Sequence, residues 1–173
     1  MLSKTPVVFS EVQQLCRPIY QDDRGAFSEL FRDQHQIEFV QDNLSISKKG
    51  VIRGMHFQVG PGQAKLVTCL AGEIYDVFVD IRPESPTFGC WGSVTLTSSG
   101  GEQVLIPVGF AHGFAALTDE AYVHYKVSSL YDPELERGFC FDDPDVGIAW
   151  PVETPILSER DQVAPRLAEV IAK

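Results

Sequence analysis

Short runs of alternating apolar and polar residues dominate the middle of the chain, from residue 40 to residue 127. Residues 74–81 (IYDVFVDI), 93–97 (SVTLT) and 121–127 (AYVHYKV) each place apolar side chains at every second position. A period of two is that of a β-strand. The pattern therefore predicts several short strands, and in the first run it puts these residues on one face: Tyr75, Val77, Val79 and Ile81.

Glycine, proline and serine separate these runs. Turn signals lie at 60–62 (GPG), 82–83 (RP), 98–101 (SSGG) and 107–109 (PVG). Many short strands at this spacing are typical of a β-sandwich or barrel, and a jelly roll is the leading choice. Since no repeat or linker divides the sequence, we expect residues 1–173 to form one domain, which is long enough to bury a core.

The last dozen residues follow a different period. Val163, Leu167, Val170 and Ile171 recur at helical spacing, which predicts a short C-terminal helix over the barrel. A weaker pattern predicts a second short helix around residues 31–38. The predicted fold class is therefore mainly β, with a few short helices.

The net charge of −10 argues against nucleic acid as a partner. An anionic ligand would instead need a local patch of arginine and lysine. No apolar run is long enough to span a bilayer, and the first residues, MLSKTPVVFSEV, contain no signal-like apolar block, so we expect a cytoplasmic protein. The cysteines form no C-x-x-C motif and are expected to be free, buried thiols: Cys16, Cys69, Cys90 and Cys140.

The segment 51–58 (VIRGMHFQ) contains a histidine close to an arginine. This pair is typical of a base beside an anion site. Strict alternation would send Arg53 and His56 to opposite faces of a strand, but Gly54 could bring them together by allowing a bulge. A core histidine and a solvent-facing arginine remain the alternative, and spacing alone does not decide between the two.

The segment 106–114 (IPVGFAHGF) has a P-x-G-x-x-H pattern that resembles the second motif of the cupin superfamily. Metal-binding cupins usually pair this motif with an earlier H-x-H and a glutamate, whereas His56 is flanked by Met55 and Phe57. A three-histidine metal site cannot be assembled from these motifs, so we expect no metal. Alternatively, the proline and glycine only shape a turn beside which His112 packs.

Two further segments each allow a functional and a structural interpretation. In 22–29 (DDRGAFSE), Arg24 is suited to hold a phosphate with two hydrogen bonds, although such a segment is also typical of a solvated turn. In 157–161 (LSERD), Ser158 and Asp161 have the spacing of a capping box. The alternative is that Asp161 accepts a hydrogen bond from a catalytic imidazole.

Tyr131 and Lys65 are equally open to two interpretations. Tyr131 follows a predicted strand at a turn (SSLYDP), where it could pack as a buried aromatic or act as a general acid on a rim. Lys65 begins an apolar strand, so it could extend from a sheet edge into water or face the interior of the barrel as a cation.

Taken together, these segments resemble the dTDP-4-dehydrorhamnose 3,5-epimerase family. They occur in that family's order and spacing over about residues 6–168. Each motif is weak alone, but the ordered set is highly specific. The segments are DDRGAF (22–27), QDNLSIS (41–47), KKGVIRGMHFQ (48–58), KLV (65–67), YDVFVDIR (75–82), SPTFG (85–89), IPVGFAHGF (106–114), YKVSSLYDP (125–133), GIAWP (147–151) and LSERD (157–161).

The resemblance implies a cupin-type jelly roll that forms a homodimer and needs neither a metal nor an organic cofactor. It implies inversion of C3 and C5 of dTDP-4-keto-6-deoxy-D-glucose to give dTDP-4-keto-L-rhamnose, in deoxysugar biosynthesis. A base–carboxylate pair would match His56 and Asp161, with Lys65 holding charge on the enolate and Tyr131 as the acid. Substrate contacts would map to Arg24, Phe27, Glu29, Gln41, Asn43, Arg53 and His112, with Arg160 as a further phosphate contact. Because the N-terminal strand crosses to the partner in such dimers, Arg24 and Glu29 would serve the other subunit's site.

The chain departs from the family's pattern at four positions. Phe141 and Leu105 replace residues that are often tryptophan, Leu130 one that is often aromatic, and Arg160 one that is often lysine. None of these departures removes a proposed catalytic group, but each could change how the nucleotide or sugar is held.

Three other functions remain as alternatives to the double epimerase. They are a single-carbon epimerase, a metal-dependent cupin oxygenase, which the missing ligands disfavour, and a non-catalytic carbohydrate-binding jelly roll.

Overall fold

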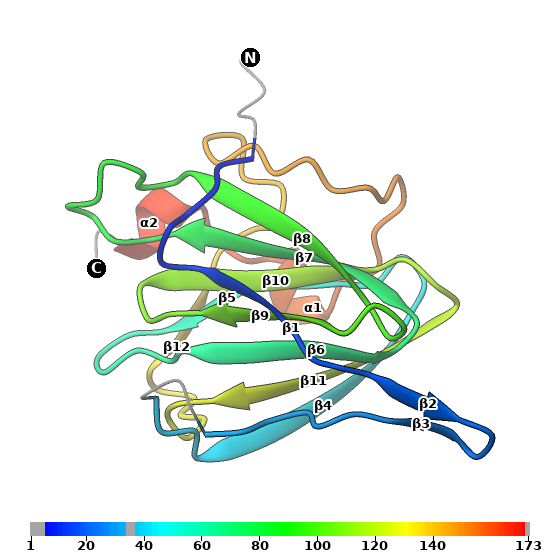
Figure 1. Ribbon diagram of the computed structural model, residues 1–173. Coiled ribbons are helices and arrows are strands. Elements are labelled where there is room, and N and C mark those ends of the chain that lie inside the picture. Colours follow the sequence, from blue (N-terminus) through cyan, green and yellow to red (C-terminus); the bar gives the residue numbers. More distant parts are fainter. Residues whose placement is uncertain (1–5, 34–36, 172–173) are drawn as a thin grey trace.

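Two five-stranded antiparallel sheets pack face to face in the computed structural model, which describes residues 6–33 and 37–171 (Figure 1). The first sheet has the order β1-β9-β6-β11-β4, with bounds Gln13–Cys16 (β1), Glu102–Ile106 (β9), Lys65–Ala71 (β6), Glu120–Val127 (β11) and Gln41–Lys48 (β4). The second has the order β12-β5-β10-β7-β8, with bounds Glu136–Gly138 (β12), Ile52–Gln58 (β5), Phe110–Ala116 (β10), Glu73–Asp80 (β7) and Trp91–Thr97 (β8). The predicted mainly β, cupin-type jelly roll is confirmed.

The first core cluster lies between the two sheets. It is built from inward-facing residues such as Val67 and Val123 of the first sheet and Phe78 and Phe114 of the second. Burying side chains of this size contributes about 1.5–3 kcal/mol each, so this cluster is a major source of stability.

A second core cluster covers the opposite face of the second sheet. The four residues predicted to share one face of the 74–81 strand do so, and they belong to this cluster together with the C-terminal residues Phe139, Val146 and Leu167. Both faces of β7 are therefore buried, one against the first sheet and one against the C-terminal part of the chain.

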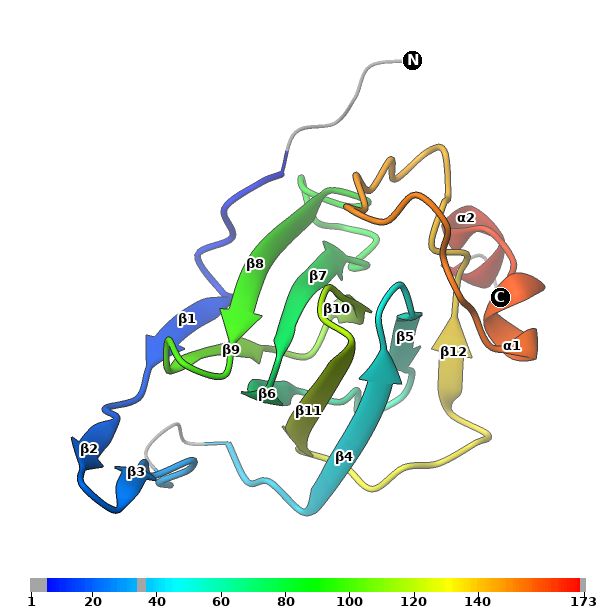
Figure 2. The same ribbon diagram turned by 90° about the vertical axis from the view of Figure 1, so that its right-hand side faces the viewer.

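The C-terminal segment contains two short helices where one was predicted, α1 (Glu159–Gln162) and α2 (Leu167–Ile171) (Figure 2). Pro165 separates them, because proline lacks an N–H donor and disfavours helical geometry in the preceding residue. Leu167 is buried as expected, but Val163 ends α1 in an exposed position.

The helix predicted around residues 31–38 is wrong for the residues that the structure describes there, and 34–36 lie outside them. Instead, the chain at Leu30 and Phe31 runs over the outer face of the first sheet. Gln103 donates a hydrogen bond to the Leu30 carbonyl, and the Lys126 ammonium lies 4.6 Å from the centre of the Phe31 ring. Tertiary contacts thus override a weak helical pattern.

All four cysteines lie among the described residues, and each is unpaired. Cys69 is buried, whereas Cys90 and Cys140 are half-buried. The expectation of burial is wrong for Cys16, which is exposed because it ends β1, the edge strand of the first sheet.

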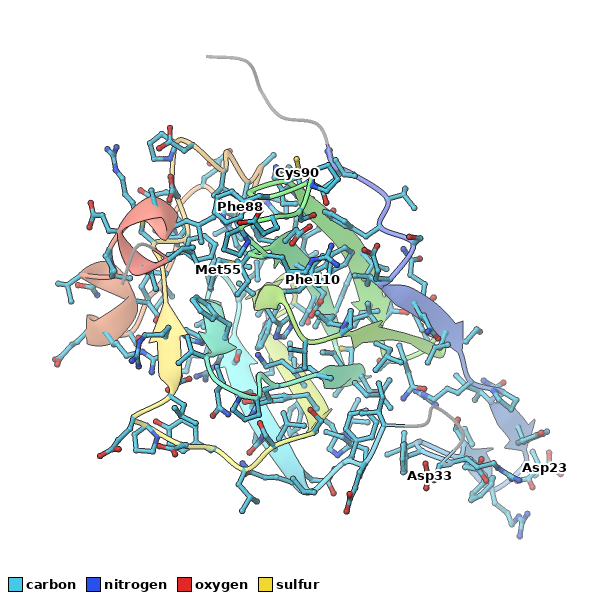
Figure 3. The ribbon with its side chains drawn as sticks, turned by 90° about the vertical axis from the view of Figure 1, so that its left-hand side faces the viewer. Asp23, Asp33, Met55, Phe88, Cys90 and Phe110 are labelled. Atoms are coloured by element: carbon cyan, nitrogen blue, oxygen red, sulfur yellow. The ribbon has the colours of Figure 1, made fainter. Side chains whose placement is uncertain are left out.

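The hairpin of β2 (Tyr20–Asp22) and β3 (Gly25–Phe27) projects away from the two sheets (Figure 2). Figure 3 shows Asp23 at its tip, far from Met55 inside the molecule. Residues 20–27 are all exposed, so nothing within this chain buries the hairpin.

A bulge interrupts β5 at Gly54, so the structure decides the question that the spacing of Arg53 and His56 left open. His112 of β10 lies opposite His56, but Phe114 lies opposite Arg53, so β5 carries one extra residue between these pairs. Since residues opposite each other share a face, the bulge turns Arg53 and His56 to the same side. Gly54 sits in the bulge with φ +125°, and a Cβ there would lie 2.6 Å from Gly113 Cα.

We expect Gly54→Ala to lower the free energy of unfolding by at least about 2 kcal/mol more than Gly25→Ala does. Both glycines have nearly the same φ, +125° and +124°, so the intrinsic backbone strain of alanine is matched. An added methyl group meets backbone at Gly54 and nothing within 4 Å at Gly25. Denaturant unfolding of both variants measures the difference, and equal losses would contradict the close approach of β5 and β10.

Candidate active site

A cavity of about 480 Å³ opens between the two sheets, lined by residues of β4, β5, β6, β10, β11, β12 and α1. Nine of the twelve residues predicted for the site line this cavity: Gln41, Asn43, Arg53, His56, Lys65, His112, Tyr131, Arg160 and Asp161. Residues far apart in sequence meet here because the jelly roll brings its strands around one interior.

His56 and Asp161 form a hydrogen-bonded pair across the cavity wall. The distance from His56 Nε2 to Asp161 Oδ1 is 2.7 Å. Burial by itself would raise the pKa of Asp161, but the hydrogen bond from His56 and the charges nearby hold that pKa below its ordinary value. Asp161 is therefore a carboxylate that accepts the imidazole N–H, which orients the ring and supports its protonated form.

The capping interpretation of the 157–161 segment is also correct, and the two roles do not compete. Ser158 caps α1 and its Oγ accepts a hydrogen bond from the backbone N–H of Asp161 at 3.1 Å. The side chain of Asp161 is left free to reach His56. The cap thus places the carboxylate at the first turn of α1, directed toward β5.

Lys65 begins β6 with its side chain buried and facing the cavity. Its Nζ donates to the backbone carbonyl of His56 at 3.3 Å, so it is not an edge lysine that extends into water. Burial lowers the pKa of Lys65 to about 8, although the negative charges of Glu136 and Asp76 oppose this shift. The amine is still mostly protonated at neutral pH and lies beside the candidate base.

His112 lies directly opposite His56 in the β5–β10 pairing and is buried. Its Nε2 is 2.8 Å from Oδ2 of Asp76, a fully buried carboxyl group whose pKa is raised by burial. The sequence interpretation missed Asp76. A signal existed, because in the 74–81 strand Asp76 alternates with residues of the predicted apolar face and so belongs to the other face with Ile74 and Phe78.

Tyr131, Glu136 and Arg160 meet at the mouth of the cavity. Tyr131 is exposed on the rim, so the interpretation as a buried aromatic is wrong. Arg160 Nη1 donates to Glu136 Oε2 at 2.6 Å, and its Nε lies 3.7 Å from Asp161 Oδ1. The hydrogen bond and negative charge of Glu136 raise the pKa of Tyr131 and favour the protonated phenol. The sequence interpretation missed Glu136, because its strand has three residues, too few for alternation to reveal.

The polar residues of β4 and β5 complete the wall. Gln41 donates to Asn43 Oδ1 at 2.8 Å and accepts a hydrogen bond from the backbone N–H of Tyr131 at 2.9 Å. Arg53 donates to Ser47 Oγ at 3.0 Å, and no carboxylate in the described part of the chain lies within 4.0 Å of its guanidinium. Arg53 therefore keeps donors available for an anion, whereas the charge of Arg160 is already paired.

Three predicted residues lie outside the cavity, on or beside the projecting hairpin. Arg24 pairs with Asp22 at 2.6 Å, and Glu29 with Arg32 at 2.8 Å. Phe27 is exposed at the end of β3. Within one chain these side chains are not brought to the site.

Within residues 6–33 and 37–171, no three His, Cys, Asp or Glu side chains are grouped closely enough to hold a metal ion. His35 lies outside the described residues. Across the same described range, none of the helices has the length and apolar character to cross a membrane.

The model of the family described as dTDP-4-dehydrorhamnose 3,5-epimerase matches residues 7–169. The chain belongs to this family. Among its relatives, a dTDP-4-dehydrorhamnose 3,5-epimerase of Shigella flexneri is 47% identical over 151 residues, covering 83% of each chain.

Two other similar proteins differ in what they are named for. A crystal structure of the dTDP-6-deoxy-D-glucose-3,5-epimerase of Legionella pneumophila with dTDP-4-keto-L-rhamnose has a TM-score of 0.90 and 43% identity, over 94% of this chain and 91% of that chain. A dTDP-4-dehydrorhamnose 3-epimerase of Streptomyces niveus is 45% identical over 156 residues, 86% of this chain and 75% of that one. Members named for inverting one carbon and for inverting two carbons are thus about equally similar to this epimerase-family chain.

We expect Lys65→Met to stabilise the protein at pH 7 by up to about 3 kcal/mol, because burial of the charged amine is removed. Between pH 8 and 10.5 the unfolded chain holds a proton that the folded chain has released from Lys65, so stability of the native protein rises across this window. The advantage of the variant should therefore shrink from pH 7 to pH 10.

Denaturant unfolding at both pH values measures this difference. Lys48→Met, at an exposed position of β4, is the matched control and should show no such pH dependence. A constant difference between Lys65→Met and the native protein would mean that Lys65 is not charged in a buried setting.

Proposed function

We propose that this chain inverts C3 and C5 of dTDP-4-keto-6-deoxy-D-glucose to give dTDP-4-keto-L-rhamnose, a step of deoxysugar biosynthesis. The observation that carries this proposal is the His56–Asp161 pair at 2.7 Å, in one cavity with Lys65 and Tyr131, in a chain of the 3,5-epimerase family. These groups are those needed for proton transfer beside a ketone.

A ketone at C4 makes the hydrogens on C3 and C5 acidic. Removal of one of them leaves an enolate, and return of a proton to the opposite face inverts the carbon. The reaction needs a base, an acid on the other face and a positive charge near O4. Only protons move, so the reaction needs no redox cofactor, and in this proposal the positive charge near O4 comes from a protein side chain and not from a metal.

In this proposal His56 is the base. Since the Nε2–H of the neutral ring donates to Asp161, the lone pair stands on Nδ1 and can accept the proton from carbon. The imidazolium that forms is stabilised by the carboxylate 2.7 Å away. Lys65 provides the positive charge for the enolate oxygen, in a buried setting where such a charge acts strongly.

Tyr131 is the proposed acid. It lies on the rim, and Glu136 keeps its phenol protonated, which is the form that an acid requires. The nucleotide phosphates would be held by arginines, with Arg53 offering unpaired donors at the cavity and Arg160 at its mouth.

We further propose a homodimer in which the N-terminal strands cross to the partner. Leu44, Ile46 and Leu70 are exposed on the outer face of the first sheet, and Tyr20 and Phe27 are exposed on the hairpin. Apolar groups gathered in this way are typical of interaction sites. Exchange of this segment would bring Arg24, Phe27 and Glu29 to the partner's cavity.

The location we propose is the cytoplasm, where thiols are kept reduced, which suits four unpaired cysteines.

A single-carbon epimerase is the second candidate, and the similarity to the Streptomyces niveus 3-epimerase favours it. Both candidates use the same base. They differ in whether the sugar can present both carbons to His56 and Tyr131 in turn. Leu130 beside the acid and Phe141 near the C-terminal segment are departures from the family's pattern that could alter this presentation.

Incubation with dTDP-4-keto-6-deoxy-D-glucose in D₂O tests the function. Deuterium at C3 and C5 with inversion at both supports the double epimerase, and label at one carbon selects the second candidate. Because a positioned base typically contributes about 10²–10⁴-fold, we expect His56→Ala and Asp161→Ala to lose at least 10²-fold in turnover while remaining folded.

The matched control for this loss is His124→Ala. His124 is also bonded to an aspartate, at 3.1 Å from Asp42, but it does not line the cavity. Its removal should leave turnover within about threefold of native. Normal turnover in a folded His56→Ala protein would contradict the assignment of the base.

Tyr131→Phe should separate exchange from inversion. His56 can still remove a proton and return deuterium to the same face, so label should enter the first carbon while inversion falls by about 10²-fold or more. Mass spectrometry measures the label and NMR the configuration. A parallel loss of both signals would show that Tyr131 is not the proton donor.

A further inference from the structure

Tyr131 has little apolar packing to hold it in place. Tyr131 is 54% exposed as a residue, and the preceding Leu130 is 66% exposed. An acid must nevertheless be placed accurately, because an error of about 1 Å in a reacting group can cost roughly 10²-fold in rate. Besides the hydrogen bond between its phenol and Glu136, Tyr131 is therefore positioned by the backbone that carries it, residues 128–132.

Glutamine side chains hold this backbone from three sides. Gln63 Nε2 donates to the Ser129 carbonyl at 2.9 Å, and Gln41 Oε1 accepts from the Tyr131 N–H at 2.9 Å. Gln58 makes the largest set of contacts. Its Nε2 donates to Ser129 Oγ at 3.0 Å and to the Leu130 carbonyl at 3.3 Å, and its Oε1 accepts from the Asp132 N–H at 2.9 Å.

Gln58 thus holds the residues immediately before and after Tyr131. The amide is buried, with 8% of the residue exposed, and its donor and acceptor atoms are both used. Hydrogen bonds of a buried group are costly to lose, since their partners are left without water. Hence the amide restricts the segment more firmly than an exposed side chain would.

The same strand carries the base. Gln58 follows His56 by two positions in β5, so both side chains leave the strand on the same face, and both line the cavity. Two residues of a strand span about 6.6 Å. The segment of β5 from His56 to Gln58 therefore sets the distance between the His56 imidazole and the loop that carries Tyr131.

We infer that Gln58 is a positioning residue that places Tyr131 for proton delivery to the face opposite His56, and so determines whether deprotonation ends in inversion. The inference rests on the proposed function. After His56 removes the carbon-bound proton, the enolate has two fates. A proton returned by the imidazole, after exchange with solvent, restores the original configuration with label. A proton donated by the Tyr131 phenol inverts the carbon and leaves a phenolate and an imidazolium; solvent reprotonates the phenolate and takes the proton from the imidazolium.

Gln58→Met tests the inference, since methionine keeps the length of the side chain and removes its three hydrogen bonds. The readout is the ratio of deuterium exchange to inversion at the first carbon, in D₂O with dTDP-4-keto-6-deoxy-D-glucose. We expect exchange within about threefold of native and inversion reduced at least tenfold, so the ratio rises by about threefold or more. Gln63→Met, which removes one contact to the same loop, should raise the ratio less.

Gln103→Met is the matched control. Gln103 is 6% exposed, lies in a strand and donates to Leu30 O at 2.9 Å and Thr68 Oγ1 at 2.6 Å, but it does not line the cavity. A loss of stability comparable to that of Gln58→Met with an unchanged ratio would separate placement of Tyr131 from a general loss of folding. The ratio is independent of the fraction of active protein.

The outcomes distinguish this inference from the function on which it rests. If the native protein exchanges no deuterium, the proposed function fails. If the native protein exchanges and inverts, and Gln58→Met lowers both equally, the function stands and the role of Gln58 is overturned. A raised ratio in Gln58→Met but not in Gln103→Met supports the inference.

Discussion

The hydrogen bond between His56 and Asp161 joins two parts of the chain that are 105 residues apart. It exists only because the C-terminal segment folds back over the second sheet. Ile156 exchanges backbone hydrogen bonds with Gly50 and Ile52, and Leu167 is buried in the cluster on the outer face of that sheet. Apolar packing of the C-terminal segment against the outer face of the second sheet therefore keeps the Asp161 carboxylate within hydrogen-bond distance of the His56 imidazole.

The interior of the barrel is divided between a core and a cavity. Along β10 the inward-facing residues change from Phe110 in the core to His112 at the cavity. The buried carboxyl groups at and beside the cavity are hydrogen-bonded to histidines, Asp161 to His56 and Asp76 to His112. The negative charges of Glu136 and Asp76 favour the charged form of Lys65, which partly offsets the cost of burying its amine. A polar interior of this kind costs stability but gives proton-transfer groups fixed positions.

The bulge at Gly54 could be predicted because strict alternation would separate Arg53 from His56, and glycine is the residue that resolves such a conflict. The pairing of Ser158 with Asp161 was visible as a spacing on a helix. By contrast, Glu136 and Gln58 gave no local signal of their roles, since each acts on groups distant in sequence. Alternation along β4 also did not show which face of the strand points into the barrel. In the structure the apolar Leu44 and Ile46 point outward, and the polar Gln41 and Asn43 face the cavity.

The strand pattern, the jelly-roll class and the ordered motifs of the family could be predicted from the amino-acid sequence, because these features depend on periodicity, turn residues and short spacings. Which strand faces form the core, the cavity or the exposed surface could be seen only in the folded chain. The folded chain also shows that one buried glutamine beside the candidate base holds the loop of the candidate acid. Such relations depend on contacts between strands far apart in the chain, and the register of those contacts is set by the packing of the whole barrel.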